Sequence, residues 1–62
     1  METAIKKYRK RMNLTQQKIS KILKITQPSY SIIEREGIKK CDTARKYAIL
    51  LGCKPSELMD LD

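Results

Sequence analysis

Histidine, tryptophan and phenylalanine are absent from this chain of 62 residues. Histidine is the usual general base near neutral pH, and no two acidic residues have the spacing of a catalytic pair. The requirements for a catalytic site are therefore unmet, and we expect that the protein is not an enzyme.

Cysteine is scarce and long apolar runs are missing. Cys41 and Cys53 have neither the spacing of a metal site nor that of a CxxC redox pair. We expect buried or half-buried free thiols in preference to a disulfide, and no metal or other cofactor. The longest apolar run, 48–51, is too short to cross a bilayer, and the N-terminus lacks the apolar core of a secretory signal. We expect no membrane association and a cytoplasmic location.

Acidic residues are outnumbered by basic ones. The chain carries 14 lysines and arginines against seven aspartates and glutamates, a formal net charge of +7. Glu2 is the one acidic residue among the first 24, whereas Glu57, Asp60 and Asp62 close the chain with no basic residue among them. This polarised charge favours a polyanionic partner, although a solvated basic face explains it equally well.

Apolar spacing and capping residues predict an all-α domain of five short helices and no strand. One small core is expected over 1–62, because a chain of this length leaves no room for a second. Thr3 is placed to cap the first helix and Asn13 to end it in the left-handed conformation. Its apolar side is predicted to carry Ala4, Ile5, Tyr8 and Met12.

Two further helices are predicted within 15–35. Thr15 is expected to cap the first and Thr26 the second, where Pro28 suits the opening turn and Gly37 marks the end. Their inward residues are expected to be Ile19, Ile22, Leu23, Tyr30 and Ile33.

Two more helices are predicted after Gly37 from the apolar spacing and the capping residues. The fourth begins at Asp42 or Thr43 and stops at Gly52, and a short fifth begins at Pro55. Their apolar residues are Ala44, Tyr47, Ala48 and Leu51 in the fourth, and Leu58, Met59 and Leu61 in the fifth.

The short connection between the two helices of 15–35 forces a compact angular pair whose second helix can project from the body. Its first turns would then present Gln27, Pro28, Ser29, Ser31 and Ile32 to solvent. Glutamine can pair with the N6 and N7 edge of adenine, serine can reach a base or phosphate, and isoleucine can contact a thymine methyl. In the structural alternative, Gln27 is an ordinary first-turn polar residue and Ile32 belongs to the core.

Three more residues are candidates for contact with phosphate. Gln16 opens its helix, where free amides and the helix dipole attract an anion. Lys39 and Lys40 follow the third helix and could embrace an adjacent phosphate backbone, although loop lysines are more often merely solvated.

From Ile5 to Met59, the chain resembles the Cro and phage-repressor class of helix-turn-helix domains, the XRE-like family. The most specific signals are Leu14, Thr15 and Gln16 in one segment, and Thr26, Gln27, Ser29, Ser31, Ile33 and Glu34 in the next. The closing segment carries Leu51, Gly52, Cys53, Pro55, Glu57, Leu58 and Met59.

This resemblance implies a lambda-repressor-like fold of five helices, with the third helix in the major groove and the second across the backbone. Carried over to this sequence, Gln27 would read a base, Gln16 would hold a phosphate, and Arg9 would pair with Glu34. Ser29 and Ile32 would sit at the groove. Thr26, Pro28 and Ser31 are further expected DNA-binding residues.

Several residues depart from the family pattern. Lys24 stands where glycine is common, which predicts a strained turn, and Tyr30 replaces a smaller residue and is expected to protrude. Ile32 occupies a position that is more often polar, and 36–41 does not align cleanly, so Lys39 and Lys40 rest on less support than the other contacts.

The resemblance implies a bacterial or phage-encoded, sequence-specific transcription regulator that binds operator DNA as a homodimer. Leu58 or Leu61 could supply dimer contacts, or could belong to the core. One alternative is a protein-interaction module of the same fold, such as an antirepressor or antitoxin component, using Pro28, Tyr30 and Ile32. Another is nonspecific binding of nucleic acid through charge alone.

Overall fold

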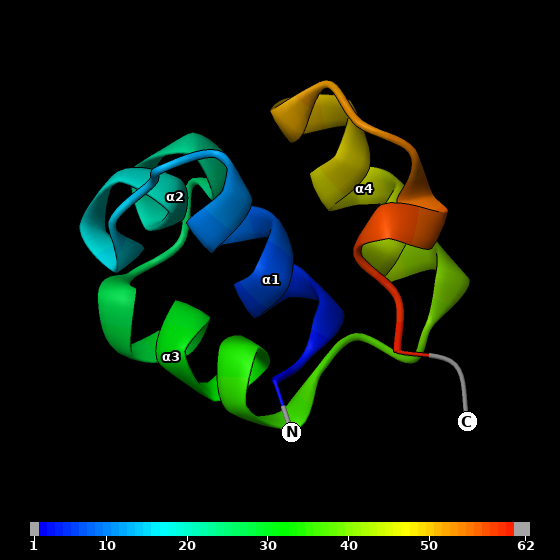
Figure 1. Ribbon diagram of the computed structural model, residues 1–62, viewed down its shortest axis with the longest axis horizontal. Coiled ribbons are helices and arrows are strands. Elements are labelled where there is room, and N and C mark those ends of the chain that lie inside the picture. Colours follow the sequence, from blue (N-terminus) through cyan, green and yellow to red (C-terminus); the bar gives the residue numbers. More distant parts are fainter. Residues whose placement is uncertain (1, 61–62) are drawn as a thin grey trace.

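The computed structural model describes residues 2–60. In chain order the elements are α1 (Ala4–Arg11), α2 (Gln16–Leu23), α3 (Gln27–Glu36), α4 (Cys41–Leu51) and a 3-10 turn, η1 (Pro55–Glu57). α1 lies in the middle of the molecule, with α2 and α3 on one side and α4 and η1 on the other (Figure 1). The predicted all-helical fold is confirmed, but residues 2–60 form four α-helices and not five.

The predicted fifth helix is replaced by the single turn Pro55–Glu57. The residues that follow pair with the α3–α4 connection instead of continuing the helix. Met59 forms a parallel bridge with Ile38, and the Asp60 N–H donates to the Ile38 carbonyl at 2.9 Å. Because this pairing needs extended backbone, the helical periodicity of the apolar residues does not produce a helix here.

One hydrophobic core joins the elements. Its buried members are Ile5, Tyr8, Ile19, Leu23, Tyr30, Ile38, Ala44, Tyr47, Ala48 and Leu58. Tyr30 is fully buried, so its inward direction is confirmed and its expected protrusion is wrong. Leu58 is also fully buried, which excludes it as an exposed dimer contact, and Leu61 lies outside the described residues.

Some residues predicted to be buried lie at the surface. Met12 follows the end of α1 and Ile22 lies at the rim of α2, and both are exposed. Cys41 is exposed because it is the first residue of α4, which begins slightly earlier than Asp42. Cys53 is half-buried as expected, and both cysteines are free thiols.

The predicted helix caps of α2 and α3 are confirmed. The Thr15 hydroxyl accepts from the backbone N–H of Lys18 at 3.1 Å, and that of Thr26 accepts from Ser29 at 3.4 Å. Gly52 ends α4 in the left-handed conformation. These ends follow from neighbouring residues in the sequence, which is why local patterns predict them.

The start of α1 is capped differently from the prediction. Thr3 occupies the N-cap position, but its hydroxyl donates to the Glu34 carbonyl at 2.6 Å. The free amide of Ala4 is instead satisfied by Asp60, whose Oδ1 accepts at 2.8 Å. The cap of this helix therefore comes from the other end of the described chain.

Two non-glycine residues lie in left-handed turns. Asn13 has φ 57° after α1, and Lys24 has φ 61° after α2. Asparagine tolerates this conformation, whereas for most other residues it costs roughly 1 kcal/mol or more. The strain expected at Lys24 is thus present as an unfavourable backbone conformation.

Candidate nucleic-acid interface

α2 and α3 are joined by three residues, Lys24, Ile25 and Thr26. The Ile25 N–H donates to the Ser20 carbonyl at 3.0 Å, which holds the turn against the end of α2. Ser20 is buried, and its hydroxyl donates to the Gln17 carbonyl at 2.8 Å. A small, internally satisfied side chain at this place allows α2 and α3 to approach closely.

The first turns of α3 present the predicted set of side chains to solvent. Its exposed members are Gln27, Pro28, Ser29, Ser31 and Ile32. Tyr30, fully buried among them, anchors this part of the helix to the core. The helix is therefore fixed from one side while the opposite side remains open to a ligand.

The exposed residues form two rows along α3. Gln27 and Ser31 are four residues apart and make a polar row, whereas Pro28 and Ile32 make an apolar row beside it. Ile32 is 49% exposed, so the alternative that placed it in the core is wrong. Side by side, the rows offer hydrogen-bonding groups and an apolar surface to the same partner.

Thr26 and Ser29 prepare a hydrogen-bond donor at the start of α3. The Thr26 hydroxyl donates to Ser29 Oγ at 2.8 Å while accepting from the Ser29 amide. Since Ser29 Oγ already accepts this bond, its own proton remains available for an external acceptor. A phosphate or base oxygen is such an acceptor.

Gln16 is drawn inward by a buried ion pair. Glu34 accepts from Arg9 Nε at 2.7 Å, so the expected Arg9–Glu34 pair is present. Gln16 Nε2 donates to Glu34 Oε1 at 3.1 Å. One amide proton of Gln16 is used in this bond, and the other remains for an outside acceptor such as a phosphate.

The environment of Glu34 keeps it ionised. Burial alone would raise the pKa of its carboxyl, but hydrogen bonds from neighbours, including Arg9 and Gln16, lower the pKa below its ordinary value. The charge of Glu34 is thus neutralised inside the domain, which limits its repulsion of a polyanion.

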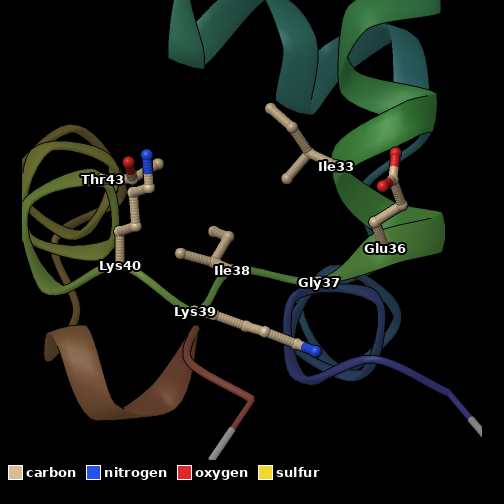
Figure 2. A pocket seen from close by; sticks show the side chains of 7 residues that line it. All are labelled: Ile33, Glu36, Gly37, Ile38, Lys39, Lys40 and Thr43. Carbon is tan, nitrogen blue, oxygen red and sulfur yellow. The ribbon is translucent and has the colours of Figure 1, made fainter.

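Lys39 and Lys40 diverge in the connection between α3 and α4. A depression of about 330 Å³ lies there, lined by Ile33, Glu36, Gly37, Ile38, Lys39, Lys40 and Thr43. Figure 2 shows the Lys40 side chain running alongside Thr43, whereas that of Lys39 points away from both. The two lysine side chains therefore leave the connection in different directions, and Lys40 is the one beside Thr43.

A second depression of about 320 Å³ is lined by Glu2, Thr3, Lys6, Gln16, Ser31, Glu34 and Arg35. It brings together Gln16 and Ser31, which the sequence analysis singled out, with Lys6 and Arg35, which it did not. Arg35 follows Ser31 by one helical turn, a spacing that could have identified it. Within residues 2–60, no group of three or more acidic or cysteine side chains is placed to bind a metal.

Comparison with known protein families gives a match over most of the chain. A protein-family model described as helix-turn-helix matches residues 5–58, which is most of the chain. No curated protein and no solved structure matches the sequence. None of the helices within 2–60 is both long and apolar enough to span a membrane.

Proposed function

Because the chain belongs to the helix-turn-helix family of the Cro and phage-repressor, XRE-like type, a family of DNA-binding regulators, we propose that it is a sequence-specific regulator of transcription. In this proposal, α3 enters the major groove and α2 lies across the phosphate backbone. The observation that carries it is the exposure of Gln27, Ser31 and Ile32 along a helix anchored by the buried Tyr30.

Each exposed residue has a defined role in the proposal. Gln27 pairs with an adenine edge, and Ile32 contacts a thymine methyl, so A·T-containing sites are favoured. Ser29, with its available proton, donates to a base or phosphate. Pro28 lies one turn before Ile32 on the same side of α3, and Thr26 holds Ser29 in place through two hydrogen bonds.

Phosphates flank the groove on both sides of α3 in this arrangement. Gln16 donates its second amide proton to one strand, and Lys40 pairs with the other. The Lys39 side chain points away from that of Lys40 (Figure 2). In the proposed interface Lys39 therefore contributes less to phosphate binding than Lys40 does.

The protein acts as a homodimer on operator DNA, as a repressor or Cro-like protein in the cytoplasm. One small module buries little surface on DNA and gains affinity from a second copy. Two copies would read half-sites about 34 Å apart, in successive major grooves.

Selection of bound sequences from a random DNA pool at near-physiological salt tests this function. The natural chain is expected to enrich an inverted repeat, and Gln27→Ala to lose about 1–3 kcal/mol of discrimination at one base position. Gln17→Ala is the matched control, because Gln17 lies on α2 and should leave base preference unchanged. No enrichment by the natural chain would contradict the proposal.

Exposed Pro28 and Ile32 also suit a protein partner, as in an antirepressor or antitoxin component. Tyr30 no longer supports that alternative, because its side chain is buried. The salt dependence of binding distinguishes the two functions. Phosphate neutralisation makes DNA affinity fall steeply with salt, whereas docking through an apolar row does not.

A further inference from the structure

Both ends of the described chain meet near the end of α3 and the α3–α4 connection. The Thr3 hydroxyl donates to the Glu34 carbonyl, and the Ala4 amide donates to Asp60 Oδ1 at 2.8 Å. The Asp60 amide in turn donates to the Ile38 carbonyl at 2.9 Å. Asp60 therefore bonds at once to the start of α1 and to the backbone between α3 and α4.

The carboxylate of Asp60 also fits closely against Gly37. A side chain at Gly37 would collide with Asp60 Oδ2, and the φ of +84° at this glycine disfavours any other residue. Oδ2 is buried and has no hydrogen-bond partner within residues 2–60. Gly37 and Asp60 thus fix the position of the connection relative to the C-terminal segment.

This connection carries a residue of the proposed interface. Gly37 and Ile38 line the same depression as Lys40 and Thr43, and Lys40 follows Ile38 by two residues (Figure 2). Ile38 is buried, with Met59 bridged to it. The direction in which Lys40 leaves the domain therefore depends on how Asp60 holds the backbone before it.

We propose that Asp60 is a positioning residue for DNA binding: it holds Gly37–Ile38 so that Lys40 meets the phosphate backbone. This inference rests on the proposed function. Asp60 does not line the depression beside Lys40, and its negative charge would repel phosphate in direct contact. Its contribution runs through the hydrogen bonds to Ala4 and Ile38.

Two substitutions that change charge equally test the proposal. Asp60→Ala and Asp60→Asn each remove one negative charge, but asparagine keeps an oxygen that can accept from the Ala4 amide. Binding is measured by fluorescence anisotropy over a range of salt concentrations. The probe is the duplex that the natural chain enriches, at a temperature where circular dichroism shows both variants folded.

Asp60→Ala is expected to weaken binding on the order of fivefold or more, despite its gain in positive charge. It should also lower the salt slope by about 1, as Lys40→Ala does, and the double variant should lose no further slope. Asp60→Asn should bind like the natural chain. Equal affinity and slope for Asp60→Ala and Asp60→Asn would overturn the positioning role while leaving the proposed function intact.

Hydrogen exchange on the natural chain keeps the proposal testable if Asp60→Ala does not fold. Coupling between two sites is reciprocal, so DNA must strengthen the bonds that position Lys40. Addition of the duplex should slow exchange of the Ala4 and Asp60 amides more than that of Cys53, which donates to Ala48 at the end of α4. Equal slowing at all three would overturn the inference, and a natural chain that binds no duplex would overturn both proposals.

Discussion

Glu34 connects three helices through a single carboxylate. It lies on α3 and accepts from Arg9 on α1 and Gln16 on α2, with the closest bond at 2.7 Å. Removing one partner of such a buried pair leaves a charge without compensation, which is more costly than the loss of a surface ion pair. The geometry of the proposed interface therefore depends on an interaction behind it.

The lowered pKa of Glu34 gives a prediction for stability against pH. Its ionised form stabilises the fold fully above the ordinary value of 4.5, and this stabilisation is lost as pH falls through the lower folded pKa. Glu34→Gln is expected to lower the free energy of unfolding by on the order of 3 kcal/mol near neutral pH. It should also reduce the loss of stability that occurs as the pH falls below about 4.5. Urea unfolding followed by circular dichroism at several pH values measures both effects.

Glu57→Gln is the control for this measurement. Glu57 also has a lowered pKa, caused first by the Lys54 amide and then by Arg11, but it lies at the surface. Its substitution should change stability much less than that of Glu34. Equal losses in the free energy of unfolding for the two variants would show that the buried Arg9–Glu34 pair stabilises the fold no more than a surface pair does.

Tyr30 contains an unsatisfied polar atom in the core. Its hydroxyl is buried and makes no hydrogen bond of normal geometry within residues 2–60, and burial, with the nearby Glu34 carboxylate, raises its pKa. Tyr30→Phe is therefore expected to leave the free energy of unfolding unchanged or to raise it by up to about 1 kcal/mol. Denaturant midpoints at neutral pH would measure the change.

Tyr8→Phe removes the same hydroxyl group but is expected to lower the stability of the fold. The Tyr8 hydroxyl donates to the Leu51 carbonyl at 3.4 Å, so its removal should cost about 0.5 kcal/mol. If Tyr30→Phe proved the more harmful of the two, the Tyr30 hydroxyl would have to bond to a neighbour such as Glu34 in solution.

At the scale of the elements, the end of α2 stores backbone strain. Lys24 adopts φ 61° and ψ 38° where glycine carries no steric cost. Lys24→Gly is expected to raise the free energy of unfolding by about 0.5–1 kcal/mol, after allowance for the greater freedom of glycine in the unfolded chain. Asn13→Gly, at φ 57°, should gain less because asparagine already tolerates this region. Thermal unfolding of both variants would compare them, and a larger gain at Asn13 would contradict this account.

Elements whose ends depend on neighbouring residues could be predicted from the sequence, and those that depend on distant contacts could not. Thr15 and Thr26 cap their helices through bonds that span three residues, so the pattern alone identified them. Thr3 has the same pattern as these two caps in the sequence, but α1 is capped by Asp60, which is 56 residues away from Ala4 in the chain. η1 stops after one turn because Met59 pairs with Ile38, which no local pattern reveals.

In the candidate interface, too, some features could be predicted from the local sequence and others depend on distant contacts. Exposure of Gln27 and Ile32 follows from helical periodicity once Tyr30 is placed inward. The inward bond of Gln16 depends on Glu34, on a different helix. The different directions of Lys39 and Lys40 follow from the backbone of the α3–α4 connection, which pairs with the C-terminal segment, so their adjacency in sequence does not reveal them.

Across the whole molecule, several cations of α1 are paired with acidic side chains. Arg9 pairs with Glu34, Lys10 with Glu2, and Arg11 with Glu57. These pairs involve α1, which lies between α3 and α4 (Figure 1). The formal charge of +7 already counts these acidic partners, so the pairs leave it unchanged. They compensate three of the five cations of α1, which places more of the uncompensated positive charge on residues elsewhere.

The position of each lysine should then decide its effect on DNA binding. If affinity came from charge alone, removing any exposed lysine would lower the salt slope equally. In oriented binding through α3, Lys40→Ala lowers the slope by about 1, because Lys40 meets a phosphate. Lys46→Ala removes the same charge from an exposed position of α4 that is not among the proposed contacts, and should leave the slope unchanged. Anisotropy titrations of both variants over a range of salt concentrations measure these slopes. Equal losses would favour nonspecific binding through charge, whereas a loss confined to Lys40→Ala requires that the domain binds DNA in one orientation.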